Sequence, residues 1–174
     1  LTSADGTTNL TERMRIDSSG HVGIGVTPSA WPTNGDYRGL QIGTGFAAFG
    51  RGSGDEDRGG ISVNYYNDGS GNKYIDDGYA NRIYIADGNI DFQYAGENSS
   101  GAGQPLTFAT GMRLERNGKV GIGETSPSTV LHLKSGSNTA ATFQTTNDGS
   151  SVSTNYITPN GTFYTGVDIG GVNS

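Results

Sequence analysis

One stretch of this sequence occurs twice, and it constrains the fold more than any other feature. The residues from Met14 to Thr27 align without a gap with those from Met112 to Thr125, and the second copy then carries one extra residue, Ser126, before its proline. A self-match of this length in a chain of 174 residues is not chance. The fold must therefore be built around two copies of one local structure.

The apolar residues of each copy lie two positions apart, which is the period of a β-strand. Each copy is therefore predicted to form a strand, a turn at residues 18–20 or 116–118, and a second strand. Asn117-Gly118 favours a type I′ hairpin turn, whose two central residues both need positive φ. The apolar residues concerned are Met14, Ile16, Val22 and Ile24 in the first copy and Met112, Leu114, Val120 and Ile122 in the second.

Glycines alone occupy the other face of each second strand: Gly23 and Gly25, then Gly121 and Gly123. Glycine weakens a strand, so glycines paired on one face predict that another backbone comes very close. An isolated hairpin has nothing to cover its apolar face. We therefore expect the apolar residues of both copies to point at the axis of an intertwined trimer. The alternative is an ordinary hairpin packed on its own domain.

The string Met-Arg-Ile-Asp-Ser-Ser-Gly-x-Val-Gly-Ile-Gly-x-Thr-x-Pro resembles a repeat in the distal parts of many bacteriophage tail fibres and tailspikes. The resemblance is close over residues 12–29 and 112–128 and looser over residues 39–110. In that family the repeat lies between fibre modules, often upstream of an intramolecular chaperone domain. The resemblance implies an extracellular homotrimer of the virion that works with other tail proteins and attaches to the host surface, commonly to its polysaccharide.

Composition and pattern together predict an all-β protein. Only 32% of the residues are hydrophobic and 30 are glycine, more than twice the usual share of about 7%. No segment shows a helical period with caps. We expect a trimeric fibre with four parts. These are residues 1–38 with the first axial repeat, residues 39–111 as an inserted antiparallel β knob (a sandwich or small barrel), residues 112–128 as the second axial repeat, and residues 129–174 as a C-terminal β segment that begins a further module.

Short β runs separated by glycine and aspartate fill the predicted knob, with turn signals at Asp68-Gly69, Asp77-Gly78 and Asp87-Gly88. These runs are residues 40–49, 61–66, 73–75, 82–86, 90–94 and 106–109. Beyond the second repeat, strands are predicted at residues 130–133, 140–144, 152–158 and 162–165.

Charge and composition argue against several classes of partner. The net charge is −6 and the lysines and arginines form no cluster, which disfavours nucleic acid as a partner. An acidic surface is repelled by anionic lipid, and no apolar run reaches the length of a membrane span, so membrane insertion is not expected. The absence of cysteine excludes disulfides and thiolate metal sites.

Tyrosines in the glycine- and aspartate-rich part of the knob predict a carbohydrate site, because their flat faces can stack on sugars while carboxylates and amides bind the hydroxyls. The candidates are Tyr65, Tyr66, Tyr74 and Tyr79, with Asn67, Asp76 and Asp77 as polar partners. The alternative is that these aromatic side chains form core and cross-strand pairs.

Two further side chains carry expectations of their own. Trp31, the only tryptophan, lies between two prolines and is predicted to be a buried cap at the end of the hydrophobic axis rather than an exposed sugar platform. His21 is replaced by Lys119 in the second copy, so it is predicted to face solvent, with no metal or acid–base role.

No sequence motif points to catalysis or to a cofactor. The chain has no nucleophile elbow, P-loop or HExxH string. A glycan depolymerase remains the rival, with Asp76, Asp77, Asp91 and Glu97 as available carboxylates. Calcium could bind the acidic loops at residues 55–57 and 68–72, although a solvated loop is favoured and no metal is expected. A third possibility is a structural fibre spacer without any ligand.

Overall fold

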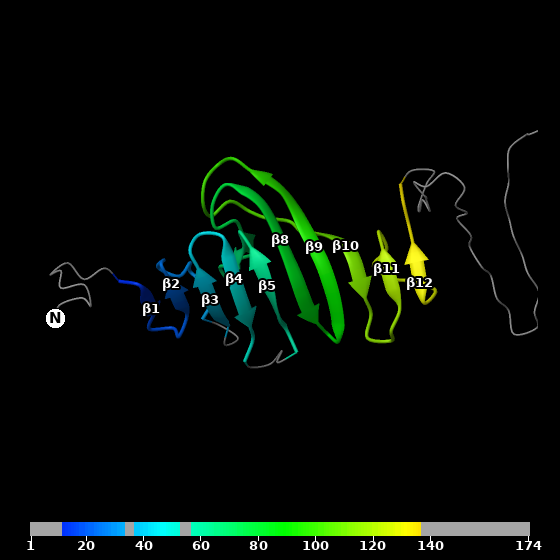
Figure 1. The fold of residues 1–174 in the computed structure, drawn as a ribbon, viewed down its shortest axis with the longest axis horizontal. Helices are drawn as coiled ribbons and strands as arrows, with labels where there is room; N and C mark the ends of the chain where they lie inside the picture. The colour runs from blue at the N-terminus through cyan, green and yellow to red at the C-terminus, as the bar shows by residue number, and fades with distance from the viewer. Residues whose placement is uncertain (1–11, 34–36, 53–56, 137–174) are drawn as a thin grey trace, which may run out of the picture. The chain divides into compact units, whose positions relative to one another are not determined.

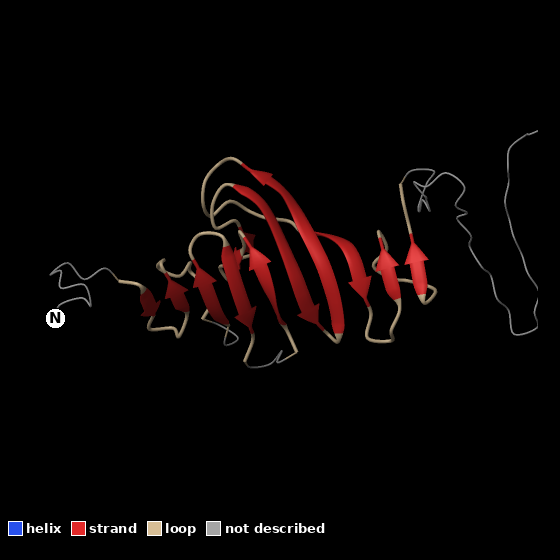
Figure 2. Ribbon diagram, viewed as in Figure 1, coloured by secondary structure: helices blue, strands red, loops and turns tan. Residues whose placement is uncertain are grey.

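The computed structural model describes residues 12–33, 37–52 and 57–136, and every regular element within them is a β-strand (Figures 1 and 2). The all-β prediction is confirmed. These residues belong to one compact unit that ends at Gly136. The described residues include no helix of the length and hydropathy needed to cross a bilayer. The strands predicted at residues 140–144, 152–158 and 162–165 lie outside the described part.

Ten strands form one sheet, and their order in the sheet follows their order in the chain. They are β1 (Met14–Ile16), β2 (Val22–Ile24), β3 (Arg38–Ile42), β4 (Phe46–Gly50), β5 (Gly59–Val63), β8 (Gly78–Ala86), β9 (Asn89–Asn98), β10 (Ala109–Leu114), β11 (Val120–Ile122) and β12 (Leu131–Leu133). Two short strands, β6 (Tyr66–Asn67) and β7 (Asn72–Lys73), form a separate hairpin.

Both copies of the repeat fold as predicted, each as a strand, a turn and a strand. β1 pairs antiparallel with β2, and the same register joins β10 to β11, with Met14 opposite Ile24 and Met112 opposite Ile122. Each hairpin is followed by a strand that pairs in parallel with its second strand: β3 with β2, and β12 with β11. Strands were predicted at residues 40–49 and 130–133, but their parallel pairing with the repeat was not.

The turn of the repeat differs from the predicted type I′. Among the described residues, positive φ outside glycine is found at Asn64 and Asp87, so Asn117 does not adopt the required conformation. Instead Gly118 alone takes positive φ (85°), and its N–H donates to the carbonyl of Glu115 (2.8 Å). This is the three-residue loop in which glycine closes a short turn. The two-residue turn with both φ values positive is Asp87-Gly88, between β8 and β9.

The strands between the repeats do not form a separate sandwich or barrel. β3, β4, β5, β8 and β9 are the middle of the same sheet that carries both repeats (Figure 1). The run predicted at residues 40–49 is a hairpin, because Gly43, with a φ of 57°, lies in a turn that separates β3 from β4. The strands of residues 39–111 thus join the repeats in one sheet, instead of the separate sandwich or small barrel that was predicted.

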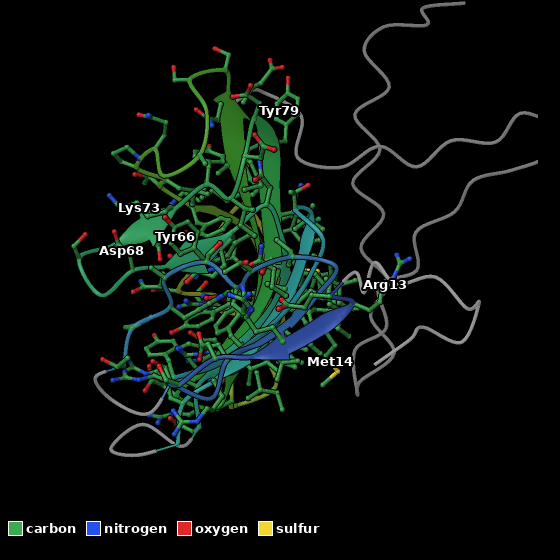
Figure 3. The ribbon with its side chains drawn as sticks, turned by 90° about the vertical axis from the view of Figure 1, so that its left-hand side faces the viewer. Arg13, Met14, Tyr66, Asp68, Lys73 and Tyr79 are labelled. Atoms are coloured by element: carbon green, nitrogen blue, oxygen red, sulfur yellow. The ribbon has the colours of Figure 1, made fainter. Side chains whose placement is uncertain are left out.

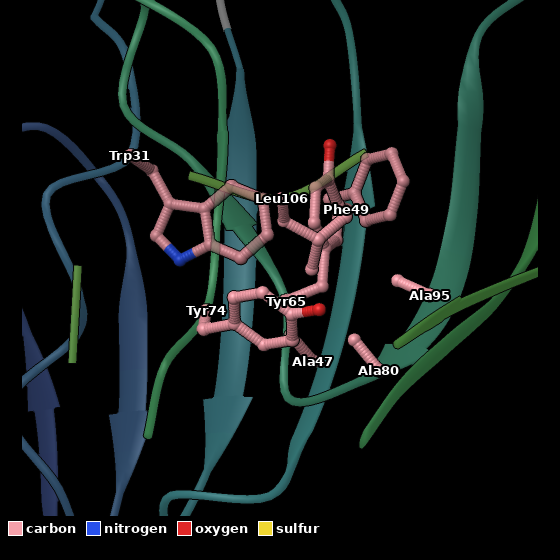
Figure 4. Close-up of a cluster of buried hydrophobic side chains, with 8 residues drawn as sticks. All are labelled: Trp31, Ala47, Phe49, Tyr65, Tyr74, Ala80, Ala95 and Leu106. Atoms are coloured by element: carbon pink, nitrogen blue, oxygen red, sulfur yellow. The ribbon is translucent and has the colours of Figure 1, made fainter. Parts of the chain in front are cut away.

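One face of the sheet is covered by the chain's own loops. Residues 64–77, which include the small hairpin, and residues 99–108 lie together over it, and the Leu106 N–H donates to the carbonyl of Asn72 (2.9 Å). The Tyr65 ring packs on Phe49 of β4 at a centroid distance of 5.4 Å, and the Phe108 ring packs on Tyr65 at 5.3 Å. The buried cluster is Trp31, Ala47, Phe49, Tyr65, Tyr74, Ala80, Ala95 and Leu106 (Figure 4).

Trp31 is buried, as predicted, but in this cluster rather than over the axial residues. Its ring stacks on Phe49 at 5.7 Å and lies so close to Gly39 that a Cβ on Gly39 would clash with it. Gly39 is opposite Phe49 in the β3–β4 pair, so tryptophan and glycine fit together on the covered face. Burial of Trp31 therefore stabilises this chain's own core.

A partly buried cation lies on the covered face. The Arg82 guanidinium lies 4.1 Å from the centroid of the Phe108 ring and 4.3 Å from that of Tyr84, and its Nε donates to Gln93 Oε1 (2.6 Å). Burial lowers the pKa of Arg82 and raises the pKa of the nearby Tyr65 to about 12. Aromatic faces thus replace part of the water around a charge that is partly buried.

His21 does not face solvent, and that prediction is wrong. Its side chain is 2% exposed, and its Nδ1 accepts a hydrogen bond from the Gly39 N–H (3.2 Å). Its Nε2 is buried and has no hydrogen-bond partner. In the second copy, Lys119 is instead partly exposed, and its Nζ donates to the carbonyl of Ser128 (3.2 Å). The same repeat position thus has two environments.

Replacing His21 with lysine should therefore destabilise the fold. The substitution removes the acceptor for the Gly39 N–H and buries an ammonium group, which we expect to cost at least about 2 kcal/mol. Urea denaturation checks the effect, and Lys119→His is the matched control, expected to change stability by less than about 1 kcal/mol. Equal stabilities for the two variants would contradict the burial of His21.

Candidate functional site

The second face of the sheet carries an uninterrupted row of apolar residues that crosses all ten strands. Strand pairing places each member directly opposite the next. From β1 to β12 the row is Ile16, Val22, Leu40, Ala48, Ile61, Ile83, Phe92, Met112, Ile122 and Leu133. We call this side of the sheet, with the parallel rows beside it, the apolar face.

The apolar face is largely uncovered in the single chain. Ile16 is 65% exposed, Ile61 47% and Phe92 43%. Figure 3 shows Met14 on one side of the strands and the loop residues Tyr66, Asp68 and Lys73 on the other. A hollow of about 430 Å³ lies on this face, lined mainly by apolar side chains such as Phe46, Val63 and Met112. Continuous exposed apolar surface of this kind marks an interaction site.

All eight predicted axial residues lie on the apolar face. Register places Met14 with Ile24, and Ile16 with Val22, on the same side as their counterparts in the second repeat. Sequence reasoning missed the apolar residues of the strands between the repeats, which complete the face. These residues show the same period-two alternation as the repeats, but this alternation was assigned from the sequence to the core of a separate module. The residues missed are Leu40, Ile42, Phe46, Ala48, Ile61, Val63, Ile83, Ile85, Ile90, Phe92 and Tyr94.

The repeat glycines have a reason within the chain itself. A Cβ on Gly23 would overlap the carbonyl oxygen of Val26, and one on Gly121 would overlap that of Glu124. Gly25 and Gly123 adopt positive φ of 66° and 69°. The backbone that approaches Gly23 and Gly121 is therefore the turn that follows each strand, while close approach by another chain stays a prediction.

The predicted ligand-binding tyrosines are divided between the core and the surface. Tyr65 and Tyr74 are buried, and the Tyr74 hydroxyl donates to the carbonyl of Gly96 (2.7 Å). Tyr66 is partly buried and lies beside Trp31 at 6.3 Å between ring centroids. Tyr79, 62% exposed, lies well apart from Tyr66 (Figure 3). The structure does not bring the four rings to one surface.

Tyr79 does share an exposed region with the two predicted acids. The buried side-chain amide of Asn64 holds this loop, because its Nδ2 donates to the carbonyls of both Asp76 and Asp77 (3.1 Å each). The side chains of Asp76 and Asp77 are exposed, and the Tyr79 hydroxyl donates to Glu97 Oε2 (3.3 Å). An exposed ring with neighbouring carboxylates is the part of the predicted sugar site that remains together. Asn67 lies elsewhere, in the small hairpin.

The remaining candidate acids serve structural contacts. Asp91 is buried and binds Arg113 through both carboxylate oxygens (2.6 and 2.7 Å). Asp68 Oδ1 accepts hydrogen bonds from the Ser70 and Gly71 N–H groups of its own turn, and the Ser70 contacts lower the pKa of Asp68. Within the described ranges, no three histidine or acidic side chains are grouped to hold a metal ion. Residues 55 and 56 lie outside these ranges.

Comparison with known proteins adds no relative. No model of a known protein family matches the chain, and no curated protein matches it significantly. The apolar face and the exposed region around Tyr79 are therefore the features of the chain that bear on its function.

Proposed function

We propose that this chain is a homotrimeric segment of a phage tail fibre or tailspike that helps to attach the virion to host surface polysaccharide, without catalysis. The observation that carries the proposal is the apolar row across ten strands. A half-exposed large apolar side chain gains roughly 1 kcal/mol when an interface covers it, so this row supports on the order of 10 kcal/mol per chain before the cost of association. Three such sheets with their apolar faces turned inward make a stiff rod.

The repeat supports a fibre in particular. Its eight apolar residues lie on the apolar face, and the fibre and tailspike repeat that the sequence resembles belongs to homotrimers. A trimer also presents three copies of any surface site, so that weak individual contacts combine through avidity. Tyr79 is 62% exposed near the start of β8, and the region around it is the surface that we assign to a glycan.

Sedimentation equilibrium of the unmodified chain tests the assembly. We expect a mass of three times 18.1 kDa. A dimer would mean that two apolar faces pack as a sandwich, and a monomer at high concentration would exclude the apolar face as a self-interface. Either outcome would overturn the trimer.

Polysaccharide binding tests the attachment role. Against a panel of bacterial surface polysaccharides, we expect Tyr79→Ala to weaken binding about tenfold, which is the usual loss for a tyrosine at the centre of an interface. Tyr79→Phe keeps the ring and is the matched control, expected to change binding less than about twofold. Release of reducing ends from a bound polysaccharide would instead reveal a depolymerase.

A structural spacer is the second candidate, and the burial of Tyr65 and Tyr74 favours it. Both rings belong to the core, which leaves Tyr79 as the exposed aromatic side chain of the predicted site. A trimer that binds no polysaccharide in the panel would support the spacer over the attachment role.

A further inference from the structure

The two copies of the sequence repeat are also two copies of one three-stranded unit. In each, a hairpin is followed by a parallel strand, and the side chain opposite the middle glycine of the hairpin's second strand accepts a hydrogen bond from the preceding loop. The Ser29 N–H donates to Gln41 Oε1 (2.9 Å), and the Ser128 N–H donates to His132 Nδ1 (3.4 Å). The match in pairing and in this contact makes β1 the structural counterpart of Met112–Leu114 in β10.

The copies differ at the outer edge of the first strand. That edge of β10 pairs with β9, where Met112 is opposite Phe92, Arg113 opposite Asp91 and Leu114 opposite Ile90. In the described part of the chain, β1 pairs with β2 alone. β1 thus has the sequence Met-Arg-Ile, which is similar to the Met-Arg-Leu of β10, and no described strand pairs with its outer edge.

The arginine of the repeat indicates which kind of strand could pair with the outer edge of β1. Arg113 binds the buried Asp91 through Nε and Nη2 at 2.6 and 2.7 Å. Its counterpart Arg15 uses the same two atoms on Glu12, three residues earlier, at 2.8 and 2.9 Å in an exposed pair. An exposed pair of this kind contributes little to stability, so its exchange for a carboxylate on an added strand costs little. A bidentate arginine–carboxylate contact would also fix the register of that strand.

We propose that the outer edge of β1 accepts an antiparallel strand with the chemistry of β9, in which an acidic residue lies opposite Arg15 between two large apolar residues. The donor is a hairpin like β8–β9 at the end of a preceding module, just as β9 precedes β10 in this chain. Main-chain hydrogen bonds along the edge provide the binding energy, and Arg15 selects the register. Successive modules would then share one continuous sheet, whichever oligomer the apolar face forms.

A disulfide in an extended chain tests the proposal. A second copy of residues 78–98 is joined by a flexible glycine–serine linker to the start of the full chain, which places it at a high effective concentration. The added copy carries Phe92→Cys and the main chain carries Met14→Cys, in the register that joins Phe92 to Met112. The chain has no cysteine of its own, so any disulfide is unambiguous. We expect this disulfide in most molecules, identified by mass spectrometry of the linked peptides.

Matched variants decide the outcome. Met112→Cys or Val63→Cys in place of Met14→Cys should give at most a tenth of the disulfide, because β9 and β8 already occupy the neighbouring positions. Asp91→Asn in the added copy should reduce the disulfide with Met14→Cys severalfold. No disulfide at Met14→Cys, or equal yields at all three positions, would overturn the proposal. A chain with Met14→Cys and no added hairpin is the last control. If it forms disulfides between two copies at the same yield, β1 pairs copies with each other, and the proposal is likewise overturned.

Discussion

An aspartate in place of Ile122 should leave the chain monomeric. Ile122 is 45% exposed and lies in the apolar row between Met112 and Leu133. In an oligomer built on the apolar face, each copy would bury a carboxylate among apolar side chains, and an unpaired buried charge costs several kcal/mol. We expect the mass from sedimentation equilibrium to fall from three times 18.1 kDa to 18.1 kDa at concentrations where the unchanged chain is assembled.

Val130→Asp is the matched control for this prediction. Val130, like Ile122, is β-branched and apolar and is 76% exposed, but it lies outside β12, one residue before Leu131 on the apolar face. The control should assemble normally, and both variants should keep the circular dichroism spectrum of a β protein. An unchanged oligomer for Ile122→Asp would show that the apolar face is not the interface.

The repeat could be predicted from sequence because its signals are local. Alternation at Met14 and Ile16, and again at Val22 and Ile24, gave both strands and the face on which their side chains lie, since neighbouring residues of a strand point to opposite faces. The turn was placed correctly but its type was not. Asn117-Gly118 fits two hairpin loops, and only the φ of Asn117 distinguishes them.

The single ten-stranded sheet could not be predicted from the same signals. Alternation assigns a residue to one face of its strand, but it does not say which sheet the strand joins. The isoleucines of β8 fit a separate sandwich as well as the shared sheet. The strand register shows that they belong to the shared sheet, because Ile83 lies opposite Ile61 and Phe92 in one row with the repeat residues.

Burial of His21 depends on residues that only the first repeat has. Trp31 follows the first copy and packs on Gly39, whose N–H donates to His21. After the second copy, the exposed Val130 stands in the corresponding loop, and Lys119 keeps contact with solvent. Comparing the two copies therefore predicted a shared environment that the neighbouring loops do not provide.

The buried Tyr65 and Tyr74 were assigned to a surface site because their segment is rich in glycine and aspartate, yet long-range contacts fold that segment onto the sheet.

Replacing Gly121 with alanine should destabilise the fold of each chain by at least about 3 kcal/mol, as expected for a clash that neither side can relieve. Gly121 is buried in β11, and the atom in the way is the backbone carbonyl oxygen of Glu124. A backbone atom held in a turn cannot move aside as a flexible side chain does. Urea denaturation with both chains also carrying Ile122→Asp, which is expected to keep them monomeric, measures the effect without a contribution from assembly.

Gly96→Ala is the control for this prediction, because Gly96 is an exposed strand glycine with open space at its Cβ position and no positive φ. Its stability should stay within about 1 kcal/mol of the unchanged chain. The pair of variants also separates two explanations of the repeat glycines. If Gly121→Ala keeps the chain folded but prevents assembly, the glycine serves the approach of another chain. If it unfolds monomer and oligomer alike, the turn at Glu124 is sufficient to account for the glycine.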